Sequence, residues 1–233
     1  MPVLQAVELG KQYNGTDALL DLNLTVEKGE IFCLLGQNGA GKTTTINLFL
    51  GFLEASAGKA LINGLEVKPN DTATRKMIAY IPEVVQLYGS LSGIENLDFF
   101  SSLAGYRYTA DELAGFLSKA GLQQQAHSSR LSTYSKGMRQ KVGIAIAVAK
   151  KADVIFMDEP TSGLDPKASA EFTEICKELA QEGKTIFMAT HDIFNAVNVG
   201  TRIGIMKKGK LIHDFIANEF NANELQQLYL ETI

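Results

Sequence analysis

The stretch Gly36-Gln37-Asn38-Gly39-Ala40-Gly41-Lys42-Thr43 decides the fold. It fits the pattern G-x-x-x-x-G-K-[S/T] and stands between an apolar run, residues 31–35, and a helical segment, residues 44–52. In this strand–loop–helix setting the glycines let backbone N–H groups turn inward around a phosphate group. Lys42 can reach the β- and γ-phosphates of a nucleotide, and the Thr43 hydroxyl can bind Mg²⁺. This phosphate loop (residues 36–43) therefore predicts nucleotide binding, whereas a simple Gly-rich turn with a solvated lysine would need neither the full motif nor its setting.

Two more apolar runs, residues 154–157 and 185–189, each end in a polar cluster. Strands that helices cover on both faces have this continuous apolar character, which is typical of parallel sheets. We therefore expect an α/β fold, with a P-loop NTPase core built on a mostly parallel sheet.

Two further parts are expected beside this core. Asn14-Gly15, in a β-like segment from residue 4 to 32, and Asn63-Gly64, between two apolar runs, are strong hairpin signals because both turn positions need positive φ. These segments predict an antiparallel β subdomain. Residues 90–151 are mostly helical and predict an inserted helical subdomain.

The composition narrows the classes of function. With 233 residues, 45% of them hydrophobic, the chain can bury a full core. A net charge of −4 offers no surface that attracts polyphosphates, so we expect no nucleic acid partner. The apolar runs are shorter than a membrane span and Met1-Pro2-Val3 begins no signal peptide, so the expected location is the cytoplasm. Cys33 and Cys176 lie in apolar runs and are expected to be reduced core residues.

Three polar residues follow the predicted strands at the edge where the phosphate loop begins. Asp158 is placed to hold Mg²⁺ through water, and Glu159 is the candidate to polarise the attacking water. For either acid alone, a solvated loop residue would be the simpler interpretation, but the phosphate loop favours the functional one. His191 emerges at the same edge and can donate to a γ-phosphate oxygen, whereas His127 and His213 lack this setting.

A fourth motif, Ser132-Thr133-Tyr134-Ser135-Lys136-Gly137-Met138, looks like the start of a helix with Ser135 as its N-cap. Its first turn carries a hydroxyl, a cation and a flexible glycine, which together with the helix dipole suit an anion. The neighbouring sequence offers no acid, base or nucleophile that would act on that anion.

With these motifs in this order, essentially the whole chain resembles the nucleotide-binding subunit of an ABC transporter. Residues 134–138 stand where that family has Leu-Ser-Gly-Gly-Gln, and we call them the signature segment. The resemblance implies that two subunits pack head-to-tail, so that Ser135, Lys136 and Gly137 face the γ-phosphate held by the partner's phosphate loop. It implies ATP and Mg²⁺ as cofactors. It also implies two partners, a second ATP-binding subunit (the same or a related chain) and an integral membrane permease, and a peripheral place on the inner face of the cell membrane.

The resemblance assigns further residues one by one. Tyr13 resembles the aromatic residue that stacks on adenine, although a tyrosine packed at a strand end is the alternative. Residues 162–165 resemble the loop that touches the partner's phosphate loop. Glu83 stands where the family usually has the glutamine that contacts Mg²⁺, and its carboxylate adds negative charge beside the phosphates. Lys136 replaces a glycine, and this signature resembles the branch whose permeases are mostly exporters.

The expected site residues form three groups. The catalytic residues are Glu159, His191 and Lys42. The nucleotide contacts are Tyr13, Gly36, Asn38, Gly39, Ala40, Gly41, Lys42, Thr43, Thr44, Ser135, Lys136, Gly137 and Asp165, and the metal ligands are Thr43, Glu83 and Asp158. Residues 1–233 are expected to be one ABC ATPase domain, in which 1–89 and 152–233 form the P-loop core with the antiparallel β subdomain and about 90–151 form the helical subdomain.

The expected function is ATP binding and hydrolysis that drive transport, with export favoured, by a separate permease. One alternative is a soluble ABC ATPase acting on DNA or the ribosome, but such relatives carry a long coiled-coil insertion or two tandem domains, and this chain has one phosphate loop and no heptad stretch. The other is a regulatory subunit that binds ATP without hydrolysing it. Glu159 and His191 argue against it, while Glu83 keeps it open.

Overall fold

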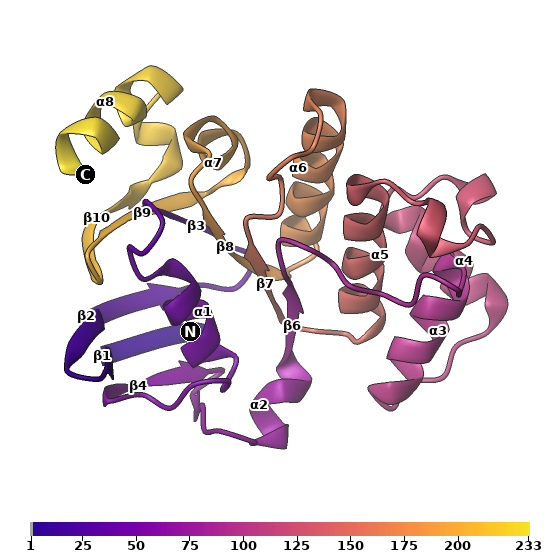
Figure 1. Cartoon of the computed structure of the whole chain (residues 1–233), viewed down its shortest axis with the longest axis horizontal. Helices are drawn as coiled ribbons and strands as arrows, with labels where there is room; N and C mark the ends of the chain where they lie inside the picture. The colour runs from indigo at the N-terminus through magenta and orange to yellow at the C-terminus, as the bar shows by residue number, and fades with distance from the viewer. Residues whose placement is uncertain (1) are drawn as a thin grey trace.

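The computed structural model describes residues 2–233 and contains two β-sheets with helices packed around them (Figure 1). The larger sheet has the strand order β10-β9-β3-β8-β7-β6, and its neighbours are parallel except for the antiparallel pair β9 and β10. This confirms the α/β fold with a mostly parallel sheet. Its strands are β3 (Ile31–Leu35), β6 (Ile78–Ile81), β7 (Val154–Asp158), β8 (Thr185–Thr190), β9 (Arg202–Lys207) and β10 (Lys210–Ile216).

The smaller sheet is antiparallel, as expected, and has the order β2-β1-β4-β5. Both predicted hairpin turns form: Asn14 and Gly15 have φ of 48° and 83°, and Asn63 and Gly64 have φ of 49° and 78°. These are the left-handed conformations that a two-residue hairpin loop requires. The strands are β1 (Leu4–Tyr13), β2 (Thr16–Val26), β4 (Ala57–Ile62) and β5 (Leu65–Glu66).

Eight α-helices and three short 3₁₀ turns are found within residues 2–233. The chain between residues 93 and 149 runs through α3, α4 and α5, which lie together at one end of the molecule in Figure 1. No helix in the described part of the chain has the length and apolar content that crossing a membrane requires. The helices are α1 (Lys42–Phe49), α2 (Thr72–Met77), α3 (Gly93–Leu103), α4 (Ala110–Lys119), α5 (Lys136–Ala149), α6 (Pro166–Gln181), α7 (Ile193–Val199) and α8 (Ala222–Thr232); the turns are η1 (Gln124–Ala126), η2 (Leu131–Thr133) and η3 (Ala217–Glu219).

The helix after the phosphate loop differs from the expectation of residues 44–52. It begins at Lys42, inside the motif, and ends at Phe49, with Leu50 as its C-cap. Gly51, at φ 67°, then takes a left-handed conformation that cannot continue a helix. The apolar run extends past this stop, which is why the sequence pattern overestimated the length of the helix.

The larger sheet separates two hydrophobic clusters. Successive side chains of β3 alternate between them, so Ile31, Cys33 and Leu35 belong to one cluster and Phe32 and Leu34 to the other. This is the two-sided burial that the apolar strand pattern predicts. Both cysteines are free and buried, and burial raises the pKa of the Cys33 thiol to about 12 and that of Cys176 as well. The interpretation of both as reduced core residues is consistent with this environment.

An aromatic group fills the cluster between the larger sheet and α1. The Phe187 ring lies 5.4 Å from Phe32, 5.6 Å from Phe156 and 6.0 Å from Phe49, measured between ring centroids. All four side chains are fully buried. Because Phe187 contacts strands β3 and β7 and helix α1, it fixes the elements from which the phosphate loop and the two acids emerge.

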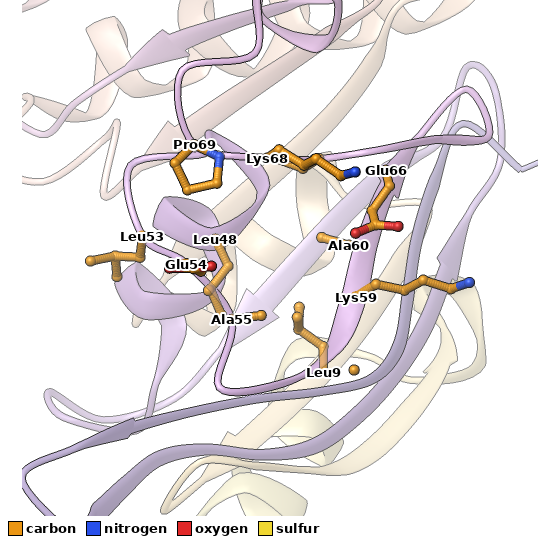
Figure 2. Close-up of a pocket in the computed structure, with 12 residues that line it drawn as sticks. Leu9, Leu48, Leu53, Glu54, Ala55, Lys59, Ala60, Glu66, Lys68 and Pro69 are labelled. Atoms are coloured by element: carbon orange, nitrogen blue, oxygen red, sulfur yellow. The ribbon is translucent and has the colours of Figure 1, made fainter.

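A pocket of about 250 Å³ lies between α1 and the antiparallel sheet (Figure 2). Leu48, Leu53 and Pro69 line one side of it in this view, and Lys59 and Glu66 lie on the other. The residues that line it include none of the predicted site residues, so this pocket is separate from the phosphate loop.

We expect Phe187→Ala to lower the free energy of unfolding by about 3–5 kcal/mol, because it removes a buried ring at the centre of this cluster. Urea denaturation followed by circular dichroism measures the change. The matched control is Phe194→Ala, since Phe194 is 54% exposed and its loss should change stability by less than about 0.5 kcal/mol. Equal effects of the two substitutions would contradict the assigned role of Phe187.

Candidate functional site

The phosphate loop connects β3 to α1 and is held in a tight conformation. Gly36 must be a glycine, because a Cβ there would lie 2.7 Å from the Met206 carbonyl oxygen of β9. Gly41, at the start of α1, has φ 110°, which L side chains rarely adopt. Lys42 folds back across the loop, and its Nζ donates to the Gly36 oxygen at 2.6 Å and the Gln37 oxygen at 3.3 Å. The lysine is only 6% exposed, so its ammonium group is held at the floor of the loop.

Glu159 lies next to Lys42, at 3.6 Å from Oε1 to Nζ. Its other carboxylate oxygen, Oε2, accepts from the Thr190 hydroxyl at 3.2 Å and the His191 backbone N–H at 3.3 Å. The His191 ring Nδ1 is 2.8 Å from the same oxygen. The buried Oε1 has no hydrogen-bond partner among the described residues, and the backbone of Glu159 takes a left-handed φ of 46°. The three predicted catalytic residues are thus brought together, and Glu159 Oε1 faces Lys42 without accepting a hydrogen bond.

Thr43 and Asp158 form the second contact of the site. The Thr43 hydroxyl donates to Asp158 Oδ2 at 2.9 Å. Burial raises the pKa of the Asp158 carboxyl, and the nearby Glu159 and Glu83 carboxylates add to the effect, although the Thr43 hydrogen bond and Lys42 act against it. A cation beside Asp158 would therefore relieve an unfavourable negative charge.

A pocket of about 360 Å³ joins these groups. The phosphate loop and α1 line one part of it, and Glu83, Asp158 and Glu159 line another. Within residues 2–233 no three His, Cys, Asp or Glu side chains gather closely enough to hold a metal ion by themselves. The oxygen donors of Thr43 and Asp158 nevertheless suit Mg²⁺, which is commonly bound by one or two carboxylates together with substrate phosphates. The residues present therefore fit a magnesium ion that arrives with a nucleotide.

The signature segment lies apart from this pocket. The Ser135 hydroxyl accepts from the Met138 N–H at 3.3 Å and caps α5, as predicted. The lining of the pocket includes Glu83 but not Ser135, Lys136 or Gly137. Ser135 is exposed, while most of α5 beyond its first turn is buried or half-buried. The N-terminus of α5 is thus partly exposed and does not line this pocket, although Lys136 lies 3.9 Å from Glu83 at the edge of it.

Comparison with known families decides the identity of this fold. Residues 19–162, more than half of the chain, match the family described as ABC transporter. The chain belongs to the ABC transporter family. The resemblance drawn from the phosphate loop and the signature segment is thereby confirmed.

Three ABC transporter proteins illustrate the relationship. An uncharacterized ABC transporter ATP-binding protein of Synechocystis sp. is 37% identical over 84% of this chain and 56% of its own length. The probable multidrug ABC transporter ATP-binding protein YbhF of Escherichia coli is 35% identical over 90% of this chain and 36% of its own length. The daunorubicin/doxorubicin resistance ATP-binding protein DrrA of Streptomyces peucetius is 33% identical over 92% and 66%, respectively. The chain therefore spans only about a third to two thirds of the length of these relatives.

Solved ABC structures share the fold. CbiO1 of Clostridium perfringens, described as part of the ABC transporter complex cbiONQ, superposes with a TM-score of 0.85 at 27% identity, over 98% of this chain and 92% of its own. A dimeric ATP-binding cassette in a post-hydrolysis state, bound to ADP and Pi, gives a TM-score of 0.82 at 25% identity, over 93% and 100%. ATP hydrolysis is thus an activity of cassettes with this fold, and the expected P-loop NTPase architecture is confirmed.

The remaining residues that were predicted to contact the nucleotide do not all line the same pocket. Asn38, Gly39 and Thr44 line the pocket of about 360 Å³. Asn38 and Gly39 also line a neighbouring pocket on the side of β9, which Ala40 lines without reaching the first. Tyr13 ends β1 with an exposed ring and does not line the nucleotide pocket. Its ring is therefore not packed in the core, and stacking on adenine stays a prediction.

Asp165, a predicted nucleotide contact, has a structural role as a helix cap. Its carboxylate accepts from the Ala168 N–H at 2.9 Å and caps α6. Sequence reasoning missed Thr190, which donates to Glu159, and Gln37, whose carbonyl holds Lys42. Thr190 directly precedes His191 at the end of β8, so its position in the sequence was the available signal.

Replacing Asp158 by asparagine tests the electrostatic cost of this site. Because its pKa is raised in the folded state, the folded protein binds this proton more tightly than the unfolded chain does. The ionised Asp158 carboxylate therefore destabilises the folded state. This destabilisation is absent below the pKa of the unfolded carboxyl, about 4, and is complete once the pH has risen above the folded pKa. We therefore expect Asp158→Asn to raise the melting temperature in EDTA without nucleotide at pH 7, with the gain vanishing toward pH 3.

Differential scanning calorimetry at both pH values measures this effect. Asp98→Asn is the control, because this substitution removes the same charge from an exposed position on α3. A melting temperature that is unchanged or lower at pH 7 would contradict the assigned cost.

Proposed function

We propose that this chain is the ATP-binding and ATP-hydrolysing subunit of an ABC transporter. The observation that carries the proposal is that Lys42, Thr43, Asp158 and Glu159 line one pocket. In it Lys42 pairs with Glu159 and Thr43 bonds to Asp158, while His191 contacts Glu159 from a neighbouring pocket. A phosphate-binding loop alone fits many nucleotide-binding proteins. An acid that borders the same pocket, with one oxygen that accepts no hydrogen bond, adds the means to hydrolyse the nucleotide.

ATP would bind with its phosphates in the phosphate loop. Phosphate oxygens would offer Lys42 charged acceptors in place of the neutral carbonyls of Gly36 and Gln37. Thr43 and Asp158, with Glu83 nearby, are the residues that would hold Mg²⁺. When bound, the ion would supply positive charge that neutralises the β- and γ-phosphates.

Glu159 is the candidate general base. Its Oε1 has no hydrogen-bond partner and can accept a proton from water, while Thr190 and His191 hold Oε2 and thereby fix the direction of the carboxylate. The His191 side chain is exposed, so its ring can contact Glu159 on one side and a phosphate on the other. Because little covalent chemistry is required of the protein, positioning and electrostatics would carry most of the catalysis.

A second subunit would complete each site. The exposed N-terminus of α5 carries Ser135, Lys136 and Gly137 but does not line the pocket of its own chain. The superposed cassette that is dimeric with ADP and Pi supports a dimer. In the dimer that we propose, this helix end reaches the partner's γ-phosphate. ATP would then bridge the two subunits, and hydrolysis would remove the bridging group.

A membrane permease is the proposed second partner, and export the proposed direction. The names of the multidrug and daunorubicin/doxorubicin resistance relatives support export. Exposed apolar side chains lie near Glu83 and on α3, which is consistent with a partner surface. They are Val84, Tyr88, Phe99 and Leu103. The subunit would accordingly work at the cytoplasmic face of the membrane.

We expect Glu159→Gln to lower steady-state phosphate release from ATP at least about 100-fold, since a general base typically contributes 10²- to 10⁴-fold. Binding of ATP, measured by equilibrium dialysis in EDTA, should stay within about three-fold of the unmodified protein, because Gln keeps the shape of the side chain. The control is Glu66→Gln on β5, an exposed acid outside the site that should retain full turnover. Turnover at the unmodified rate in Glu159→Gln would overturn the assignment of the base.

The permease is tested by capture from membranes. We expect Glu159→Gln protein, held in its ATP-bound form, to retain one polytopic membrane protein from detergent-solubilised membranes of its host, and to lose it when ATP is omitted. Recovery of ribosomes or DNA-bound complexes with no membrane protein would instead support a soluble ABC ATPase.

A further inference from the structure

One carboxylate oxygen connects three segments that the proposed mechanism treats separately. Glu83 Oε1 accepts from the Ser162 hydroxyl at 3.1 Å and lies 3.9 Å from Lys136 Nζ. Glu83 follows β6, Lys136 is the first residue of α5, and Ser162 belongs to the loop before α6. The cation that the proposed dimer would direct at the partner's nucleotide is therefore paired, in the single subunit, with an acid of its own chain.

The rest of α5 holds Glu83 in place. Gln140, one turn beyond Lys136 and 1% exposed, donates from Nε2 to the Glu83 carbonyl oxygen at 3.3 Å. At Gly143 an added Cβ would lie 3.6 Å from the Val85 side chain, so the helix packs closely on the segment after β6. The same helix thus contacts residue 83 twice, since the Gln140 side chain bonds to its backbone and the Lys136 ammonium faces its carboxylate.

Only one member of the Glu83–Lys136 pair lines the nucleotide pocket of its own chain. Glu83 lines the nucleotide pocket of its own chain together with Asp158 and Glu159. Lys136 lies at the helix end that does not line this pocket. In a head-to-tail dimer the two residues of one chain would therefore belong to different nucleotide sites.

We propose that Glu83 and Lys136 are positioning residues that couple the two nucleotide sites: the Glu83 carboxylate holds Lys136 in the nucleotide-free subunit and releases it for the partner's phosphate when a cation binds in its own site. This inference rests on the proposed function. Glu83 can face Lys136 or a cation beside Asp158, and Lys136 can face Glu83 or the partner's phosphate. Nucleotide and cation in one site thereby free Lys136 at the start of α5 to contact the phosphate in the other site.

The competing interpretation is an ordinary surface ion pair. The Glu83 and Lys136 side chains are 53% and 33% exposed, and pairs of this kind contribute little to stability. Stability measurements would therefore not distinguish the two interpretations. ATP-dependent dimerisation does, because only coupling makes the effect of changing Glu83 depend on Lys136.

The experiment uses the full chain with Glu159→Gln, so that ATP is not consumed, and follows dimerisation by analytical ultracentrifugation during ATP titration in EDTA and in Mg²⁺. In EDTA no cation draws Glu83 away, and we expect Glu83→Gln to strengthen dimerisation about two- to five-fold by freeing Lys136. Lys136→Gln should weaken dimerisation in both buffers. In the Lys136→Gln background, Glu83→Gln should bring no gain.

Two matched variants complete the design. Glu66→Gln removes the same charge from an exposed position on β5 that does not line the nucleotide pocket, and should leave the ATP dependence unchanged. Lys136→Arg keeps the cation and should restore the gain from Glu83→Gln.

The outcomes separate the two proposals. Additive effects of Glu83→Gln and Lys136→Gln, or weaker dimerisation of Glu83→Gln in EDTA, would overturn the coupling while leaving an ATP-driven dimer in place. A Glu159→Gln parent that forms no dimer with ATP in either buffer would contradict the proposed function itself.

Discussion

The parallel pairing of β3, β8 and β7 is the constraint on which the rest of the molecule depends. Leu35 of β3 pairs with Thr190 of β8, and Ala189 of β8 pairs with Asp158 of β7. Because these strands run in the same direction, the segments that leave their carboxyl ends meet at one edge of the sheet. Lys42, Glu159 and His191 therefore become neighbours although they are far apart in the sequence. The buried rings of Phe32, Phe156 and Phe187, one on each of these strands, pack together on one face of the sheet.

That edge carries strain and unsatisfied charge that the packed sheet supports. Asp158 has a raised pKa, Glu159 has a left-handed backbone and an oxygen that accepts no hydrogen bond, and Lys42 is nearly buried. Each of these features is unfavourable in a protein without a ligand. The raised pKa, the oxygen without a hydrogen bond and the buried ammonium would be relieved by a cation, a water molecule and phosphates, respectively. The groups that are unfavourable in the free protein are thus the ones that would interact favourably with a bound nucleotide.

The sequence predicted features that depend on a few neighbouring residues. The Asn14-Gly15 and Asn63-Gly64 turns, the Ser135 cap and the apolar strands all form where expected, because turn chemistry, capping and continuous burial are local signals. Short helices such as α2 and α7 were not predicted, since six or seven residues carry too little periodicity. Contacts such as Thr190 with Glu159, and Gln140 with the backbone of residue 83, depend on packing between distant segments, and no local pattern shows them.

The two charged departures from the family pattern, at residues 83 and 136, complement each other. An acid in place of glutamine at residue 83 adds a negative charge to the pocket of its own chain, and a lysine in place of glycine at residue 136 adds a positive charge to the helix end. In the single subunit the two charges face each other. In a head-to-tail dimer each nucleotide would meet Glu83 from one chain and Lys136 from the other. The total charge around each nucleotide would then equal that of a cassette with neither substitution, so the acid is tolerable beside phosphates because the partner's lysine balances it.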